Sequence, residues 1–133
     1  MLFAFFNIFM PHRTAGVKIG INMNSNETLK LNKDFKRLYY RGKCVAARCV
    51  VVYAQKNKLN RNRLGLTCGK TVGKAVKRNR AKRLMRESYR HLCGGMKQGY
   101  DIVIVARTRI ADKKCGDVQK DVRYAFSKLD MIV

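Results

Sequence analysis

The segment that most constrains the fold runs from about Val72 to Leu92, where apolar and basic side chains recur with the period of an α-helix. At about 100° per residue, small and apolar side chains gather on one side of this helix, and polar, mostly basic ones gather on the other. The first set is Ala81, Leu84, Met85, Ser88, Tyr89 and Leu92, and the second is Asn79, Arg80, Lys82, Arg83, Arg86 and Arg90. The pattern predicts a helix that packs one face on a core and presents the other to a partner.

The charge of this helix is almost entirely positive. Between Lys70 and Arg90 nine Lys and Arg residues stand against the single acid Glu87, whereas a face that is merely solvated usually mixes both signs. Lys74, Lys77 and Arg78 ignore the division into two faces, so we expect the first turns to project past the core. Because guanidinium groups suit bidentate contacts with phosphate, the segment is predicted to bind RNA. The predicted RNA contacts are Lys74, Lys77, Arg78, Asn79, Arg80, Lys82, Arg83, Arg86 and Arg90.

The composition of the whole chain agrees with a polyanionic partner. Its 133 residues carry 30 Lys and Arg against 8 Asp and Glu, a formal charge of +22, and 47% of them are hydrophobic. That hydrophobic fraction supports a folded core rather than a disordered basic tail. The length suits one domain, which we place at residues 29–133, and nucleic acid is the leading class of partner.

Residues 1–28 are expected to form an extension outside the core. The opening run MLFAFFNIFM is about half the length needed to span a bilayer, and no positive charge precedes it as in a signal peptide. We therefore expect no membrane partner, with a membrane anchor as the minority alternative. The sequence leaves open whether translation starts at Met1 or at Met23, and a start at Met23 would mean that residues 1–22 are not native.

No catalytic or metal site of the protein itself is predicted. The five cysteines include no C-x-x-C pair, which indicates free thiols in a reducing cytoplasm. The two histidines have no neighbouring carboxylate or cysteine cluster, and the eight acids show no pairing suited to two-metal chemistry. Any reaction that the chain serves would take its reactive groups from elsewhere.

The pattern of the chain predicts an α+β fold with the order α-β-β-α-β-α. Asn32 would cap a first helix that ends at Gly42, and the run from Cys44 to Ala54 would be one buried strand. A second strand from Arg63 to Cys68 would pair with it as a hairpin, before the basic helix. A third, central strand would follow from Asp101 to Arg107, and Asp117 would cap the last helix. A strand, a helix and another apolar strand imply a crossover, so we expect helices packed on a small sheet.

At this level of detail the chain resembles the bacterial ribonuclease P protein subunit. The resemblance rests on R-L-G-L at Arg63–Leu66, on V-G-K-A-V-K-R-N-R at Val72–Arg80 and on K-R-L-M-R-E at Lys82–Glu87. It extends from about Leu31 to Leu129, with Asp34, Phe35, Tyr39 and Gly42 in one pattern and Asp101–Arg107 in another. The family implies a small α/β sandwich like ribosomal protein S5 domain 2, with a left-handed β-α-β crossover that the general preference for right-handed connections would not predict.

The resemblance also implies a function as part of an endoribonuclease holoenzyme. The protein would bind a catalytic RNA and the 5′ leader of precursor tRNA, and so assist removal of the leader. Hydrolysis would use Mg²⁺ held mainly by the RNA subunit, and no tightly bound cofactor of the protein is expected. The R-N-R helix would contact RNA through Arg78, Asn79, Arg80, Lys82, Arg83 and Arg86. Phe35, Tyr39, Tyr53 and Lys70 would line the cleft for the single-stranded leader, where aromatic rings stack on unpaired bases.

Two other functions fit parts of the sequence. A ribosomal RNA-binding structural protein would share the charge and the small α/β fold but would lack a leader cleft with exposed aromatic rings. A stand-alone nuclease would need carboxylates or histidines in a catalytic arrangement that the sequence does not show. Packing between a helix and the sheet is the structural alternative to a leader-binding role for Phe35 and Tyr39.

Overall fold

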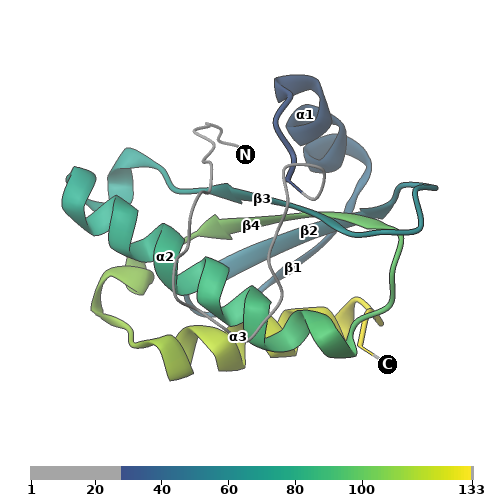
Figure 1. Cartoon of the computed structure of the whole chain (residues 1–133). Helices are drawn as coiled ribbons and strands as arrows, with labels where there is room; N and C mark the ends of the chain where they lie inside the picture. The colour runs from purple at the N-terminus through teal and green to yellow at the C-terminus, as the bar shows by residue number, and fades with distance from the viewer. Residues whose placement is uncertain (1–27, 133) are drawn as a thin grey trace.

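The computed structural model describes residues 28–132, and in them one mixed sheet is covered by helices on both faces (Figure 1). The expected extension, including Met23, lies almost wholly outside these residues. The elements are α1 (Asn32–Arg41), β1 (Lys43–Ala46), β2 (Val50–Lys56), β3 (Arg63–Thr67), the 3₁₀ turn η2 (Lys70–Val72), α2 (Ala75–Leu92), the short turn η3 (Cys93–Gly95), β4 (Tyr100–Ala106), the 3₁₀ segment η4 (Thr108–Asp112) and α3 (Cys115–Lys128). The predicted α+β class is confirmed, with one more strand than the sequence suggested.

The sheet has the order β1-β2-β4-β3. β1 and β2 are antiparallel, β2 and β4 are antiparallel, and β3 runs parallel to β4 with Leu66 opposite Ile104. The predicted hairpin between the second strand and the strand before it is therefore wrong. β4, which is apolar on both faces, takes the central place between them, because that position buries both of its faces. The prediction that β4 is central is confirmed.

The expected single strand from Cys44 to Ala54 is also wrong, because the chain reverses between β1 and β2. The turn is held by contacts from residues far away in the sequence. The backbone N–H of Cys49 donates to Asp121 Oδ2 of α3 at 2.8 Å, and Arg107 Nη1 donates to the carbonyl oxygen of Ala47 at 2.8 Å. The segment contains no glycine or proline to announce a turn, so its partners in α3 and after β4 fix the reversal.

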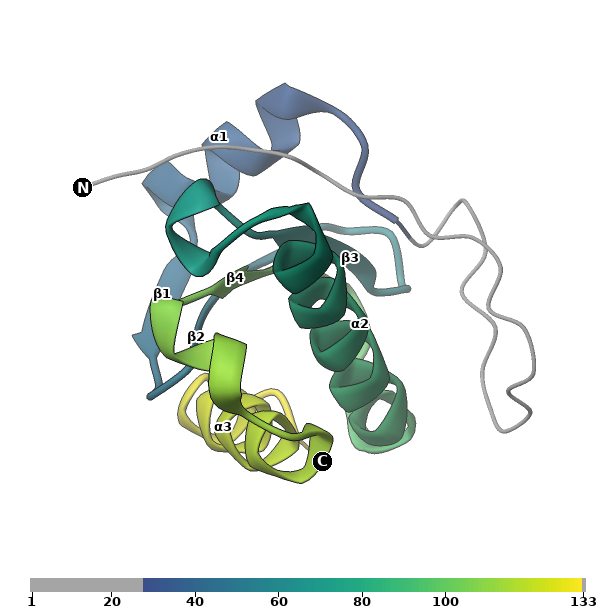
Figure 2. The ribbon, with the colours of Figure 1, turned by 90° about the vertical axis from the view of Figure 1, so that its left-hand side faces the viewer.

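The connection from β3 through α2 to β4 is the predicted crossover. Figure 2 looks along the sheet from the side at which β3 and β4 end, with α1 above the sheet and α2 and α3 below it. From β3 the chain passes below the sheet through α2 and returns as β4 to the left of β3, which makes the crossover left-handed (Figure 2). The fold thus has the uncommon handedness that the family resemblance implied.

An apolar cluster lies on each face of the sheet. On the side of α2 and α3, alternate residues of the strands, such as Val52, Leu66 and Ile104, pack with Met85 and Phe126. On the side of α1, a smaller cluster contains Leu29, Phe35, Leu38 and Val103, with Tyr39, Tyr53 and Val105 at its margin. Among the described helices α1 is the one that covers this second face, and Tyr39, Tyr53 and Val105 there are half-buried.

The helix ends differ from the predictions by a few residues. α1 ends before Gly42 as expected, but Asn32 is its first residue and Leu31 occupies the cap position. α2 ends at Leu92 as expected and begins at Ala75 rather than Val72, because Gly73 has a φ of 146° that breaks the helix from η2. In α3 Asp117 lies in the first turn and accepts from the backbone N–H of Lys114 at 3.3 Å, instead of occupying the cap position.

Gly65 sets the distance between α1 and β3. A Cβ atom at Gly65 would lie 2.6 Å from Phe35 Cζ and 3.3 Å from Leu29 Cβ. Gly65→Ala is therefore expected to lower the free energy of unfolding by about 1–3 kcal/mol, the usual cost of overpacking a core. Urea unfolding followed by circular dichroism measures the effect. Gly69→Ala is the matched control, because its Cβ meets nothing closer than Thr71 Oγ1 at 4.0 Å. Equal stability of the two variants would contradict the close approach.

Candidate nucleic-acid interface

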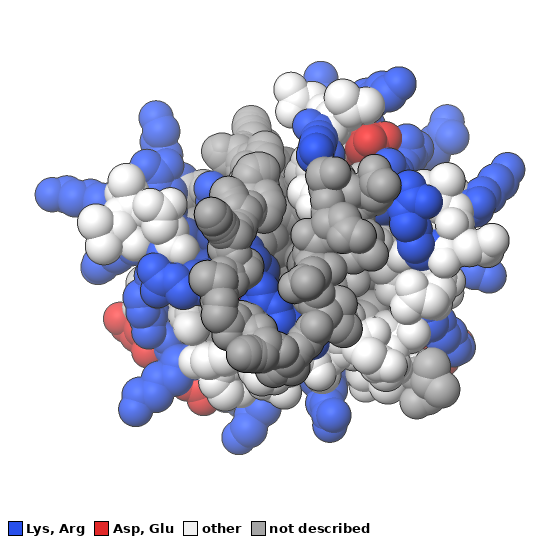
Figure 3. Space-filling model, viewed as in Figure 1, with Lys and Arg blue, Asp and Glu red and all other residues white. Residues whose placement is uncertain are grey.

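The two faces of α2 are separated as the sequence predicted. Ala81, Met85, Ser88, Tyr89 and Leu92 are buried against the sheet and α3, and Leu84 is half-buried. On the other side Lys74, Lys77, Asn79 and Arg83 are exposed, and Arg78, Arg80, Lys82, Arg86 and Arg90 are half-buried. Lys and Arg side chains are spread over the face of the molecule seen in Figure 3, and Asp and Glu occupy few places on it. All nine predicted contacts thus lie on or beside one helix.

The guanidinium group of Arg80 is hydrogen-bonded within the protein. It donates to the carbonyl oxygens of Ala111 in η4 and Lys113 just after it, at 3.2 and 2.8 Å. This contact fixes η4 against the first turns of α2. Arg80 therefore holds the basic helix in place, and its use in RNA binding stays a prediction that this geometry does not favour.

Arg90 is also engaged within the fold. It forms an ion pair with Glu87 one turn earlier, and only 8% of its side chain is exposed. The charges available to an anionic partner on α2 are accordingly concentrated in its first three turns. Lys74, Lys77, Arg78 and Arg83 lie there.

The basic groups of α2 crowd one another. Burial lowers the pKa of Lys82, and the positive charges of Arg78 and Arg86 lower it further. Burial likewise lowers the pKa of Arg86, and Arg90 and Arg83 add to the effect. The Nε atom of Arg78 is buried without a hydrogen-bond partner among the described residues. A phosphate beside this cluster would reduce the repulsion between the positive charges and would accept a hydrogen bond from Arg78 Nε. These basic groups are therefore arranged as expected for a site that binds a polyanion.

The predicted leader residues occupy the face of the sheet that carries α1. Tyr39 of α1 and Tyr53 of β2 meet edge to face with ring centroids 5.0 Å apart, and the Tyr39 hydroxyl lies 3.2 Å from Thr67 Oγ1 at the end of β3. Both tyrosines are half-buried. Lys70 is exposed in η2, three residues after Thr67. The structure thus brings the two tyrosines together and places Lys70 on the segment that follows β3.

Phe35 has a different environment from the two tyrosines. Its side chain is buried, with 6% of the residue exposed, and its ring lies against Gly65 and Leu29. This position fits the structural alternative for Phe35, in which the ring packs α1 against β3. Phe35 belongs to the buried cluster against which Tyr39 and Tyr53 pack, and a direct contact between Phe35 and RNA stays a prediction.

Both tyrosines remain uncharged near neutral pH. Burial raises the pKa of Tyr39, although the hydrogen bond to Thr67 opposes this. Burial and the neighbouring Cys44 raise the pKa of Tyr53 to about 12. The two hydroxyl groups therefore add no negative charge to a surface that would receive phosphates.

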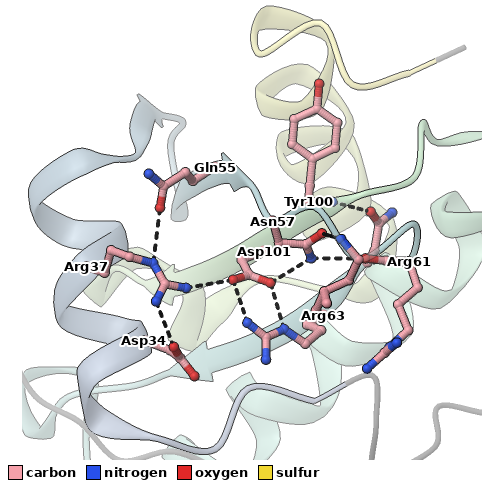
Figure 4. A network of polar contacts seen from close by, with 10 residues as sticks. Asp34, Arg37, Gln55, Asn57, Arg61, Arg63, Tyr100 and Asp101 are labelled. Atoms are coloured by element: carbon pink, nitrogen blue, oxygen red, sulfur yellow. Dashed lines mark hydrogen bonds and ion pairs between the residues drawn. The ribbon is translucent and has the colours of Figure 1, made fainter.

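A polar network that the sequence analysis missed fixes the other end of this face (Figure 4). Asp101 of β4 is 1% exposed and accepts four hydrogen bonds: two from Arg63 (2.8 and 2.7 Å), one from Arg37 (2.9 Å) and one from Asn57 (2.8 Å). Burial alone would raise the pKa of Asp101, but the hydrogen bonds of Arg63 and Asn57 and the charges of Arg63 and Arg37 outweigh it and lower that pKa. One buried carboxylate therefore joins α1, β3, β4 and the loop after β2.

Several other described acids are also held by contacts within the fold, among them Glu87, Asp117 and Asp121. Arg37 also pairs with Asp34 at 2.9 Å, and no group of three or more His, Cys, Asp or Glu suited to a metal ion occurs in residues 28–132. All five cysteines lie in the described residues and are thiols rather than disulfides, as expected from the sequence, and Cys93 Sγ donates to the carbonyl oxygen of Arg90 at 3.4 Å. Within the same residues, no helix is long and apolar enough to cross a membrane.

Comparison with known proteins gives one consistent result. The sequence model of the Ribonuclease P family matches residues 23–130. The chain is 49% identical over 98 residues to the ribonuclease P protein component of Clostridium botulinum (strain Loch Maree / Type A3), covering 73% of this chain and 87% of that one. It is 37% identical over 110 residues to the same component of Alkaliphilus metalliredigens, covering 83% and 99% of the two chains.

Solved structures agree with the sequence comparison. The RNase P protein of Staphylococcus aureus superposes with a TM-score of 0.73 at 31% identity, covering 80% of this chain and 98% of that one. The RNase P protein of Thermotoga maritima gives a TM-score of 0.67 at 30% identity, covering 74% and 93% of the two chains. The similarity therefore extends through sequence, secondary structure and three-dimensional arrangement.

Proposed function

The chain belongs to the ribonuclease P protein component family, and on that premise we propose that it binds the catalytic RNA of ribonuclease P and the 5′ leader of precursor tRNA in the bacterial cytoplasm. Membership in the family implies a role in tRNA processing as part of an endoribonuclease. The observation that carries the finer proposal is the presence, on one small domain, of a basic helix face and a partly open aromatic face of the sheet.

In this proposal α2 supplies most of the affinity for RNA. Lys74, Lys77, Arg78 and Arg83 place their charges in the first turns, and each phosphate that they neutralise releases condensed counterions. Such contacts position a protein on RNA without reading its sequence. Arg80 holds η4 and α2 together, so that the face keeps its shape when RNA is absent.

The leader lies, in the proposal, on the face of the sheet beside α1. Tyr39 and Tyr53 offer rings to unpaired bases, and half-buried Val51 and Val105 flank them on β2 and β4. Stacking tolerates any base because every base has a π-face. Lys70 would contact the leader backbone. The surface thus suits leaders of different sequence.

We assign no chemical step to the protein. No group of three or more His, Cys, Asp or Glu suited to a metal ion occurs in residues 28–132, and two of the buried acids, Asp34 and Asp101, are bound by arginines. Mg²⁺ for the hydrolysis is proposed to be held by the RNA subunit. The contribution of this chain is to bind and orient the two RNAs.

A leader-specific loss of affinity tests the aromatic part of the proposal. Tyr53→Leu is expected to weaken binding of precursor tRNA to the reconstituted ribonucleoprotein about 5- to 100-fold, because a stacked base contributes about 1–3 kcal/mol. Binding of mature tRNA, which has no leader, should not change. Tyr53→Phe should restore the affinity, and Tyr40→Leu serves as a matched control because Tyr40 is 88% exposed on the outer side of α1. An equal loss for mature tRNA would contradict the leader site.

A further inference from the structure

A second basic site lies apart from α1 and from the basic face of α2, where the β1–β2 turn, η4 and α3 meet. An open pocket of about 520 Å³ is lined there by Ala46, Ala47, Arg48, Arg107, Arg109, Asp121 and Tyr124. Its volume falls within the ~300–1,000 Å³ range of sites that hold small molecules and cofactors. Three arginines and a tyrosine surround this pocket with a single acid, and none of these four residues belongs to either apolar core cluster.

The floor of the pocket is fixed by hydrogen bonds. Asp121 Oδ2 accepts from the backbone N–H of Cys49, and Arg107 Nη1 donates to the carbonyl oxygen of Ala47, each at 2.8 Å. The backbone N–H of Arg107 donates to the carbonyl oxygen of Cys49 at 2.9 Å. Asp121 and one nitrogen of Arg107 are therefore committed to holding the turn. The site is preorganised, which lowers the entropic cost of binding a ligand.

The remaining polar groups of the pocket are free to meet an anion. Arg48 and Arg109 are exposed, and no acid within residues 28–132 forms an ion pair with either of them. The Tyr124 ring is 51% exposed, and Lys128 Nζ lies 5.7 Å from its centroid. The three guanidinium groups exceed the single carboxylate by two charges. Planar guanidinium groups bind phosphate with paired hydrogen bonds, and an exposed tyrosine ring stacks on an unpaired base.

We propose that this pocket binds a nucleotide of single-stranded RNA, with its phosphate at Arg48, Arg107 and Arg109 and its base against Tyr124. The inference rests on the proposed function insofar as the partner is RNA, and it adds a contact surface separate from the leader residues and from the solvent face of α2. η4, which carries Arg109, is fixed to α2 by Arg80. Both basic surfaces are therefore anchored to one rigid segment.

A single tryptophan gives a site-specific test, because the natural chain contains none. Single-stranded oligouridylate is expected to quench the fluorescence of the full-length Tyr124→Trp variant. Adding Arg48→Ala and Arg109→Ala to that variant should raise the Kd from quenching about 100-fold, because each of the two charge-assisted contacts contributes on the order of a factor of ten. Lys120→Ala with Arg123→Ala removes the same charge from exposed positions of α3 outside the pocket, and should change the Kd much less.

The other results each have one meaning. No quenching by oligouridylate, equal quenching by polyglutamate, or equal losses in the two double variants would overturn the pocket as an RNA site. Circular dichroism shows whether each variant is folded. If the double alanine variant does not fold, the Arg48→Lys, Arg109→Lys pair replaces it. This pair keeps the charge but loses the paired hydrogen bonds, so it should bind oligouridylate more weakly than the parent variant while retaining part of the affinity. Stimulation of precursor tRNA cleavage by the wild-type protein is measured in parallel. Stimulation without quenching refutes this inference alone, whereas absence of stimulation refutes the proposed function.

Discussion

Asp101→Asn is expected to lower the free energy of unfolding by about 3 kcal/mol. The amide keeps the shape of the carboxyl but places an NH₂ group among four donors from Arg37, Asn57 and Arg63. Removing one partner of a buried ion pair usually costs about 3–5 kcal/mol. The lower end applies here because the Arg37 and Arg63 side chains keep 37% and 22% exposure and regain some hydration. Urea unfolding at neutral pH measures the difference.

Asp130→Asn is the matched control for Asp101→Asn. Its partner Lys97 lies 3.4 Å away, and the two side chains are 89% and 43% exposed. Exposed ion pairs contribute about 0–1 kcal/mol, so this variant should unfold almost as the wild type does. A cost for Asp101→Asn no larger than that of Asp130→Asn would show that the network in Figure 4 does not stabilise the fold.

The effect of Asp101 on stability should also depend on pH. Its pKa is lowered in the folded protein, so the unfolded state takes up the proton first as the pH falls. The stabilisation is complete above about pH 5 and is lost as the pH falls through the folded pKa, which lies below the usual ~3.9. The difference in stability between the wild type and Asp101→Asn should therefore be constant from pH 7 to 5 and shrink below pH 4. A constant difference down to pH 2 would contradict the lowered pKa.

Arg78→Ala combined with Arg83→Ala is expected to weaken binding to the catalytic RNA about 100-fold. Each guanidinium that loses a phosphate contact removes on the order of 1.5 kcal/mol. The slope of log K against log salt concentration should become less steep by about 2, because two fewer phosphates are neutralised. Lys120→Ala with Arg123→Ala removes the same charge from α3 and should change the slope much less. An unchanged slope in the α2 variant would exclude the basic face as the RNA contact.

Local patterns predicted the parts of the fold that depend on neighbouring residues. The two faces of α2 follow from the helical repeat of Ala81, Met85 and Leu92, and the central place of β4 follows from its continuous apolar run. The turn between β1 and β2 was missed because it depends on Asp121 and Arg107, which are 72 and 60 residues from their partners. No local propensity carries that information.

Side-chain contacts within the folded protein also explain what the sequence could not show of the site. Every basic residue of the polar face of α2 was assigned to RNA, but Arg80 binds the carbonyls of η4 and Arg90 pairs with Glu87. Phe35 is buried because Gly65 lets α1 approach β3 closely. Asp101 was seen only as an acid at the start of a strand. The sequence feature that could have indicated a buried, ion-paired Asp101 is the presence of two arginines, Arg37 and Arg63, in the first helix and the neighbouring strand.

The most direct test of the account is cleavage of 5′-labelled precursor tRNA by the catalytic RNA of the family at low Mg²⁺, with and without this protein. We expect the protein to increase cleavage when the RNA is present and to cut nothing when the RNA is absent. Cleavage by the protein alone would place an active site on this chain. No stimulation, together with intact binding to ribosomal RNA, would contradict the account and favour a ribosomal protein.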